Sequence, residues 1–303
     1  MNDDTILRIK NLSISFKMYD KGLLHKELKV INNLNLSLRQ GEILAVAGAS
    51  GSGKSLLAHG ILGILPDNAQ VAGEISYLGT PLTEKRIKEL RGNDIAFVPQ
   101  SVEFLNPLMR VGQQVASDRA AVGKVFARYQ LDQRVGELFP FQLSGGMMRR
   151  VLCATAVVGA AKLIIADEPT PGMSQELAEM AMKHFRDLAD AGAAVLLITH
   201  DLEMALDYAD RIAVLYAGTA VETAYAADFT CEEKLRHPYT KALWRAMPKN
   251  GFRPTLGIQP YAGSLREGCM FAPRCEARTE QCVCGIIEPQ VLRGGEVCCL
   301  NAC

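Results

Sequence analysis

Apolar and polar side chains alternate in short runs near the start of the chain. The alternation covers residues 6–16 and 30–38, and a period of two predicts strands of a sheet with one exposed face. Residues 43–47 are apolar throughout and are followed by Gly48, as in a parallel strand that is buried on both faces. The beginning of the chain therefore predicts a partly exposed sheet that leads into a buried one.

Three later runs resemble residues 43–47. They cover residues 95–98, 163–166 and 194–199, and residues 54–64 read as a helix. Each run is followed by polar residues that are capable of chemistry. In a parallel α/β sheet such residues gather at the carboxyl edge of the strands, where ligands bind. The pattern predicts an α/β fold with a parallel core sheet and a site at that edge.

A helical insert interrupts the strands. Residues 101–150 lack strand alternation, and residues 111–130 are rich in Ala, Val, Gln and Arg. We therefore expect helices here, between the second and third buried strands.

The pattern changes again near the end of the chain. The strand signals end at about Thr230, residues 237–247 fit one amphipathic helix, and residues 251–303 are loop-rich. We therefore divide the chain into a domain of residues 1–235 and a C-terminal extension of residues 236–303.

Charge and apolar content exclude several classes of protein. Lys plus Arg and Asp plus Glu both number 33 among 303 residues, so no net charge draws the chain to nucleic acid or to an anionic membrane. The acidic start does not read as a signal peptide. The most apolar stretch, residues 151–166, contains Lys162 and is shorter than the roughly 18 residues that span a bilayer. We expect a cytoplasmic protein without a nucleic-acid partner; at a membrane, other subunits would supply the spanning helices.

A glycine-rich stretch gives the most specific chemical signal. Residues 48–55 read GASGSGKS and fit the phosphate-binding pattern G-x-x-x-x-G-K-[ST] between a buried strand and a helix. Backbone amides in such a loop bind phosphate, Lys54 would reach the outer phosphates, and Ser55 would ligate Mg²⁺. The candidate nucleotide-binding residues of this loop are Gly48, Ser50, Gly51, Ser52, Gly53, Lys54, Ser55 and Leu56.

Two adjacent carboxylates follow the buried run at residues 163–166. Asp167 would hold Mg²⁺ through water, and Glu168 would polarise the attacking water as general base. An Asp-Glu pair after a strand fits a solvated helix start equally well. The functional interpretation therefore depends on the phosphate-binding loop.

Three further motifs complete an ordered set. Gln100 follows one buried strand, Ser144-Gly145-Gly146 precedes Asp167, and His200 follows the last buried strand. In this order of motifs the chain resembles the ATP-binding cassette (ABC) family, with its P-loop, Q-loop, LSGG signature, Walker B and H-loop. The resemblance implies a parallel core sheet with an antiparallel β subdomain and a helical insert. It also implies ATP and Mg²⁺ as ligands and ATP hydrolysis coupled to transport.

The resemblance also implies a role for each matching position. Gln100 would sense Mg²⁺ and the attacking water, and His200 would contact the γ-phosphate. Ser144, Gly145 and Gly146 would act on ATP held by a partner cassette. The implied catalytic residues are Glu168, His200, Gln100 and Lys54, and the implied Mg²⁺ ligands are Ser55, Gln100 and Asp167.

Two positions fit the family less well. Phe16 lies at the position that stacks on adenine, but a lone aromatic residue in a strand fits a core role equally well, and Tyr19 is the alternative. Ser174 replaces the aspartate that ends the family's D-loop. Because that aspartate couples the two composite ATP sites, we expect its loss to affect communication between them rather than hydrolysis.

Four stretches resemble the branch that imports peptides and nickel. They are residues 105–107 (LNP), 140–147 (PFQLSGGM), 237–243 (HPYTKAL) and 268–275 (GCMFAPRC), of which the last two are the specific ones. The resemblance implies an importer subunit at the cytoplasmic face of the membrane. Its partners would be a second ATPase subunit, identical or related, two permease subunits and, indirectly, an extracytoplasmic substrate-binding protein. Short peptides are the favoured cargo, and nickel or a metal chelate is the alternative.

Two other classes of function stay open. One is a soluble ABC ATPase without a transport role, against which the single cassette, the absence of net charge and the importer-like segments argue. The other is a regulatory cassette that does not hydrolyse ATP, against which the intact Glu168 argues.

Most of the nine cysteines lie after residue 268. A disulfide framework is not expected in a cytosolic protein, where thiols are kept reduced. The family tail implies a four-iron cluster, [4Fe-4S], on Cys269, Cys275, Cys282 and Cys299, with Cys298 as the alternative to the last. Zinc, or a tail of reduced thiols without metal, stays open. Cys284 and Cys303 have no assigned role.

Overall fold

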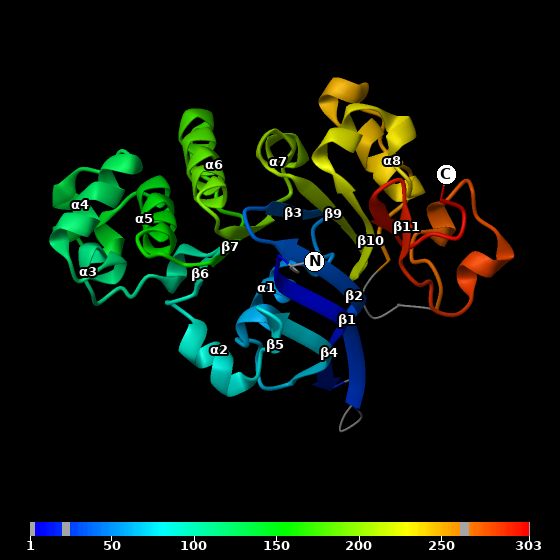
Figure 1. The fold of residues 1–303 in the computed structure, drawn as a ribbon, viewed down its shortest axis with the longest axis horizontal. Helices are drawn as coiled ribbons and strands as arrows, with labels where there is room; N and C mark the ends of the chain where they lie inside the picture. Colours follow the sequence, from blue (N-terminus) through cyan, green and yellow to red (C-terminus); the bar gives the residue numbers. More distant parts are fainter. Residues whose placement is uncertain (1–3, 20–24, 261–266, 303) are drawn as a thin grey trace.

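Two β-sheets organise the chain, and Figure 1 shows how the other elements surround them. The computed structural model describes residues 4–19, 25–260 and 267–302. Helices α3 to α5 form one end of the molecule in Figure 1, and the C-terminal extension, yellow to red, forms the opposite end. Within the described residues, no helix is long and apolar enough to span a bilayer.

The smaller sheet has four strands in the order β2-β1-β4-β5. Its strands are β1 (Thr5–Tyr19), β2 (His25–Arg39), β4 (Ala69–Tyr77) and β5 (Thr80–Pro81). All neighbours pair antiparallel, and register shifts interrupt the β1–β2 ladder. Those irregularities explain why the alternation in the sequence breaks into short runs although only two long strands form.

The larger sheet has the order β11-β12-β10-β9-β3-β8-β7-β6. The strands β9, β3, β8, β7 and β6 run parallel, whereas β10, β12 and β11 pair antiparallel. The parallel strands are β3 (Ile43–Gly48), β6 (Ile95–Val98), β7 (Leu163–Asp167), β8 (Ala194–Ile198) and β9 (Arg211–Tyr216). The antiparallel ones are β10 (Thr219–Tyr225), β11 (Gln290–Leu292) and β12 (Gly295–Val297). The predicted α/β fold class is confirmed.

The parallel strands are apolar throughout because they face a core on both sides. In β3, Ile43, Ala45 and Ala47 pack into one cluster with the insert and α6, while Leu44 and Val46 pack into the other with β1 and α1. Each of these side chains is at most 1% exposed. A strand with no solvent face has no alternation, as the sequence predicts for these runs.

Eight α-helices are present in the described residues. They are α1 (Lys54–Leu62), α2 (Glu84–Leu90), α3 (Val111–Val115), α4 (Arg119–Arg128), α5 (Gly145–Val157), α6 (Gln175–Asp190), α7 (Leu202–Tyr208) and α8 (Pro238–Arg245). The expected helical stretch at residues 111–130 is broken between α3 and α4. Asp118 causes the break, because its carboxylate accepts hydrogen bonds from the amides of Ala120 and Ala121 and starts a new helix.

The C-terminal extension continues the larger sheet. Strand β12 pairs with β10 through Glu222 and Val297 and through Thr223 and Glu296, and β11 pairs with β12. The expectation that strands end near Thr230 was therefore wrong. Each of these strands has only three residues, which is too short for a recognisable alternation in the sequence.

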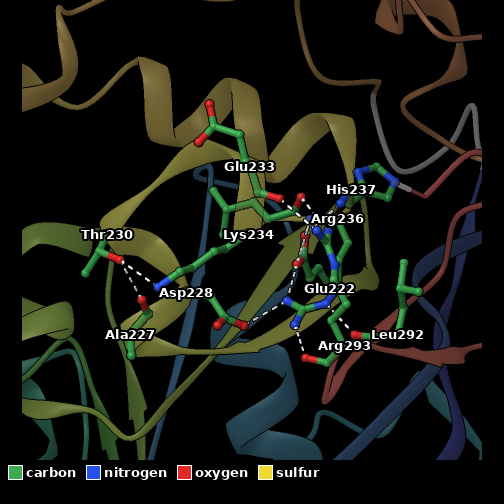
Figure 2. Close-up of polar contacts among 11 residues, drawn as sticks. Glu222, Ala227, Asp228, Thr230, Glu233, Lys234, Arg236, His237, Leu292 and Arg293 are labelled. Atoms are coloured by element: carbon green, nitrogen blue, oxygen red, sulfur yellow. Dashed lines mark hydrogen bonds and ion pairs between the residues drawn. The ribbon is translucent and has the colours of Figure 1, made fainter.

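A buried ion pair holds this extension to the sheet (Figure 2). Arg236 and Glu222 are each 1% exposed, and Arg236 Nη1 lies 3.2 Å from Glu222 Oε1 and 2.9 Å from Asp228 Oδ2. The same guanidinium donates to the carbonyls of Leu292 and Arg293, at the turn between β11 and β12. One side chain thus joins strand β10 to the C-terminal hairpin.

The partners of Glu222 complete this arrangement. Its carboxylate also accepts hydrogen bonds from the backbone amides of Arg236 and His237. A Cβ atom at Gly295 would lie 2.6 Å from Cζ of Arg236, so only glycine allows β12 to approach the guanidinium. Both buried charges therefore have several partners, as such groups need.

We expect Arg236→Met to destabilise the chain by about 3–5 kcal/mol, because the substitution leaves the Glu222 carboxylate buried without its counter-ion. Equilibrium unfolding in urea measures the change. The matched control is Arg245→Met, which breaks the more exposed pair with Glu232 and should cost at most about 1 kcal/mol. Equal losses in the two variants would show that the buried pair has no special importance.

Candidate functional site

The phosphate-binding loop joins β3 to α1. Gly48 ends the strand so close to β9 that a Cβ atom would lie 2.4 Å from the carbonyl oxygen of Leu215. Gly51 and Gly53 have φ angles of 78° and 96°, in the left-handed region that favours glycine. Ser50 and Gly51 are exposed at the loop, whereas Ser52 is fully buried and Leu56 is half-buried against the core shared with β1. The tip of the loop, at Ser50 and Gly51, is therefore open to solvent.

Lys54 lies across this loop. Its Nζ donates to the carbonyl oxygens of Gly48 and Ala49 at 2.8 and 3.1 Å, and the residue is 8% exposed. Burial lowers the pKa of Lys54, while the carboxylates of Glu168 and Asp167 act in the opposite direction. Two backbone carbonyls thus hold the ammonium group within the loop.

Ser55 and Asp167 lie together, as the sequence predicts for a Mg²⁺ site. A hydrogen bond from Ser55 lowers the pKa of Asp167, but burial has the larger effect and raises it. Asp167 Oδ1 and Ser52 Oγ are buried without a hydrogen-bond partner among the described residues. Buried polar atoms normally have partners, so these oxygens fit a site for a hard cation and its ligands.

Glu168 and His200 form a close pair at the same sheet edge. His200 Nδ1 lies 2.6 Å from Glu168 Oε2, and Glu168 is 6% exposed. The amide of Glu168 donates to the carbonyl of Ile198 in β8, and its φ of 48° is left-handed, which is uncommon for a residue other than glycine. This backbone turns the carboxylate toward His200.

The signature residues lie at the N-terminus of α5. Ser144 caps the helix by accepting a hydrogen bond from the amide of Met147 at 3.3 Å. Ser144 and Gly145 are exposed, and nothing lies within 4 Å of a Cβ built at Gly145. A Cβ at Gly146 would lie 3.1 Å from the carbonyl of Gly172. The first two residues are therefore available to a second molecule.

Arg149 was not recognised from the sequence. Its Nη1 donates to the carbonyl of Pro99 at 3.0 Å, which ties α5 to the residue before Gln100. Burial lowers the pKa of the guanidinium, while Cys153, Asp167 and Glu168 act in the opposite direction. An arginine in a helix gives no signal in the sequence that it will reach a neighbouring loop.

Four other predicted residues are Gln100, Ser174, Phe16 and Tyr19. Gln100 is exposed after β6, and Ser174 is exposed and caps α6 through a hydrogen bond from the amide of Leu177. Phe16 is half-buried and packs against the core of the smaller sheet, whereas Tyr19 is 71% exposed. The adenine-stacking role of Phe16 or Tyr19 stays a prediction.

Aromatic side chains join the C-terminal extension to the phosphate-binding loop. The rings of Tyr239 in α8 and Tyr216 in β9 lie 4.4 Å apart, and both contact Phe271. Arg274 lies over Tyr216 and Phe271. Burial raises the pKa of Tyr239, and a hydrogen bond with the backbone of Ala49 acts in the opposite direction. The extension thus reaches the loop that would hold phosphate.

A small cavity in the extension is bordered by the four cysteines that the sequence indicates as cluster ligands: Cys269, Cys275, Cys282 and Cys299. His237 borders the same cavity. In the part of the chain that the structure describes, no three His, Cys, Asp or Glu residues form a preformed metal site, and every cysteine is a free thiol. The cavity therefore gathers the thiols without fixing them in a ligand geometry.

Backbone amides lie close to the sulfur atoms at this cavity. Burial raises the pKa of the Cys269 and Cys275 thiols, and that of Cys299 to about 11. Hydrogen bonds from the backbone act in the opposite direction at all three. Cys282 Sγ accepts from the amide of Thr279 at 3.5 Å and from Asn301 Nδ2 at 3.4 Å. Each of the four sulfurs thus has a donor nearby.

Cys298 and Cys284 have surroundings that differ from those of the four cavity cysteines. Cys298 borders a separate cavity beside Glu296, and burial together with Glu296 and Glu288 raises its pKa to about 12. Cys284 is exposed, and Cys303 lies outside the described residues. Burial lowers the pKa of His237 to about 3, so its imidazole is neutral.

We expect Gly48→Ala to destabilise the chain by about 1–3 kcal/mol, because the methyl group would overlap the carbonyl of Leu215. Gly145→Ala is the matched control: its methyl group meets open space, so stability should stay within about 0.5 kcal/mol. Chemical denaturation of both variants measures the difference. A destabilised Gly145→Ala variant would contradict the outward orientation of the signature residues.

Comparisons with known proteins support one family. The model of the ABC transporter family matches residues 31–171, and that of the oligopeptide/dipeptide transporter C-terminal region matches residues 221–282. The dimeric post-hydrolysis structure of the ATP-binding cassette MJ0796, bound to ADP and phosphate, superposes with a TM-score of 0.65 at 25% identity. That match covers 73% of this chain and 99% of the other.

Similar proteins carry the names of peptide transporters. The probable D,D-dipeptide transport ATP-binding protein DdpD of Escherichia coli is 34% identical, and the match covers 91% of this chain and 90% of DdpD. The oligopeptide transport ATP-binding protein OppD of Mycobacterium tuberculosis is 33% identical over 95% of this chain, which spans only 50% of OppD. The chain belongs to the ABC transporter family, in the branch of the oligopeptide and dipeptide transport ATP-binding proteins.

Proposed function

We propose that this chain binds and hydrolyses ATP to energise the import of dipeptides or oligopeptides. The observation that carries the proposal is the Glu168–His200 pair, 2.6 Å apart at the sheet edge that also carries Lys54 and Asp167. General-base catalysis needs a carboxylate that is oriented toward the attacking water. Here the carboxylate is held by a histidine beside the phosphate-binding loop.

The residues at this edge have separate tasks in hydrolysis. The loop amides and Lys54 would bind the phosphates, and Ser55 and Asp167 would hold Mg²⁺, which neutralises phosphate charge. Glu168 would accept the proton of the attacking water. His200 orients that carboxylate and is itself 62% exposed on its side chain, so it can also reach a phosphate oxygen. Gln100 would contact the Mg²⁺ site from the end of β6.

The exposed signature residues make the site incomplete in one molecule. Ser144 and Gly145 are exposed at the N-terminus of a 13-residue helix, and a Cβ atom at Gly145 would meet open space; such a terminus favours an anion. We infer that they close on ATP held by a second cassette. The related cassette MJ0796 is a dimer in its post-hydrolysis state, which supports this assembly. Ser174 would lie near the junction and weaken the coupling between the two sites.

A groove of about 490 Å³ lies beside the helical insert, and it favours this part of the surface as the contact for a permease subunit. Phe97, Phe104 and Gln114 line it, and Phe104, Leu108 and Met109 are exposed nearby. Phe104 and Gln114 follow Gln100 in the sequence, so a membrane subunit bound in this groove would be connected to the nucleotide site. The chain would then lie at the cytoplasmic face of the membrane. The relatives are named for oligopeptide or dipeptide transport, which favours peptides over nickel as cargo.

The cysteine cavity would hold an iron–sulfur cluster in this proposal. Four thiols border one space, and N–H donors lie near every sulfur. Hydrogen bonds of this kind stabilise the negative charge of thiolate ligands and tune the potential of a cluster. Cys299 fits the fourth position better than Cys298, because Cys299 borders the cavity of the other three thiols and Cys298 borders a separate one. The cluster would supply a redox-active group at the extension.

Glu168→Gln should lower ATP turnover by about 10²–10⁴-fold, because the amide cannot accept the proton of water. Binding of Mg-ATP should persist, since Lys54 and Asp167 are unchanged. Phosphate release by the assembled dimer and calorimetry with Mg-ATP measure the two quantities.

Glu176→Gln is the control for this experiment. Glu176 is an exposed acid in the first turn of α6, and its loss should leave turnover unchanged. If Glu168→Gln turned over ATP at the normal rate, the assignment of Glu168 as general base would be wrong.

Cys299→Ser should remove most of the iron and acid-labile sulfide from anaerobically purified protein, whereas Cys298→Ser should retain both. The reason is that only Cys299 borders the cavity of the other three thiols. Metal and sulfide analysis of the two variants beside the unsubstituted chain gives the result. Zinc without sulfide, or no metal in the unsubstituted chain, would overturn the cluster.

A further inference from the structure

His237 borders the cysteine cavity, although nothing in the sequence indicates a role for it beyond its place in the HPYTKAL segment. His237 is only 1% exposed. One ring nitrogen, Nε2, lies 3.9 Å from Sγ of Cys269. Histidine is a common metal ligand, so its function beside four thiols has to be decided from its hydrogen bonds.

The other ring nitrogen decides the tautomer. Nδ1 of His237 accepts a hydrogen bond from the backbone amide of Tyr239 at 3.0 Å. A backbone amide can only donate, so Nδ1 carries no proton. In a neutral imidazole the proton is then on Nε2, the nitrogen that lies near Cys269. A protonated nitrogen cannot bind a metal, but it can donate a hydrogen bond to a thiolate.

The buried ion pair fixes this orientation (Figure 2). The backbone amide of His237 donates to Glu222 Oε2 at 2.8 Å, and the neighbouring Arg236 is held by Glu222 and Asp228. Arg236 also holds the carbonyls of Leu292 and Arg293, in the hairpin that precedes Cys299. The same network therefore sets the position of the histidine and of one wall of the cavity.

We propose that His237 is a positioning residue that donates a hydrogen bond from Nε2 to the Cys269 thiolate and is not itself a ligand. This role rests on the cluster proposed above. A donor to a ligating sulfur stabilises the extra negative charge of the reduced state, so it raises the reduction potential of the bound group. Backbone hydrogen bonds also reach Cys269, but the His237 donor belongs to a side chain and can be removed by substitution.

His237→Ser tests this role. His237 is the N-cap residue of α8. Serine is also a good N-cap, so its hydroxyl can replace Nδ1 as acceptor of the Tyr239 amide, but its side chain is too short to donate to Cys269. We expect the iron and sulfide content to stay at the level of the unsubstituted chain, and the midpoint potential in a spectroelectrochemical titration to become more negative. His237→Ala should give the same shift of the potential together with a lower unfolding temperature, because the cap is lost as well.

His184→Ser is the matched control, since His184 lies on α6 and does not border the cysteine cavity; it should leave the potential unchanged. Loss of iron from the His237→Ser protein would show that the histidine is a ligand. A normal cluster with an unchanged midpoint potential would show that no hydrogen bond from His237 affects that potential. Either result overturns the role of His237 alone. Absence of a cluster from the unsubstituted chain overturns the cluster as well.

A second measurement needs no substitution. In iron-free protein labelled with ¹⁵N-histidine, the NMR signals of His237 should show a proton on Nε2 and none on Nδ1, with His237→Ser identifying the signals. The opposite tautomer would overturn the proposal.

Discussion

The pairing of parallel strands in the larger sheet is the constraint on which the candidate site depends. Val46 of β3 and Asp167 of β7 both pair with Ile198 of β8, so all three strands end at one edge. This shared edge brings the P-loop, the Asp167–Glu168 pair and His200 together, although they are far apart in the sequence. A shift of one residue in any ladder would exchange the two faces of that strand. Because both faces are buried against separate cores, such a shift is strongly disfavoured.

The C-terminal extension contacts the larger sheet and the phosphate-binding loop at three places. Its hairpin continues the larger sheet, the Arg236–Glu222 pair lies beneath the hairpin, and Tyr239 packs on Tyr216 beside the phosphate-binding loop. These three contacts allow the extension little movement relative to the larger sheet. The cysteine cavity therefore shares its support with the nucleotide site, because α8 carries Tyr239 toward the loop and begins beside His237.

Features that depend on neighbouring residues could be predicted from the sequence, and features that depend on distant contacts could not. The apolar run of β3 and the glycines of the loop have local physical causes, and the order of motifs predicted the fold and the proximity of Ser55 to Asp167. The hairpin at β11 and β12 pairs with the edge of β10, which lies far from it in the sequence. Nothing near Arg149 in the sequence indicates that it contacts Pro99, and nothing near His237 indicates that it faces Cys269.

The hairpin also affects the behaviour of the protein in a crowded solution. The middle of strand β10 is buried, and β12 pairs with Glu222 and Thr223 at its outer edge. A strand edge without such cover presents free amide and carbonyl groups to any extended chain that it meets, and this is a common route to aggregation. The outermost strand, β11, has only three residues and follows a proline, so it offers little backbone for pairing. The β11–β12 hairpin thus protects the larger sheet from association with other chains.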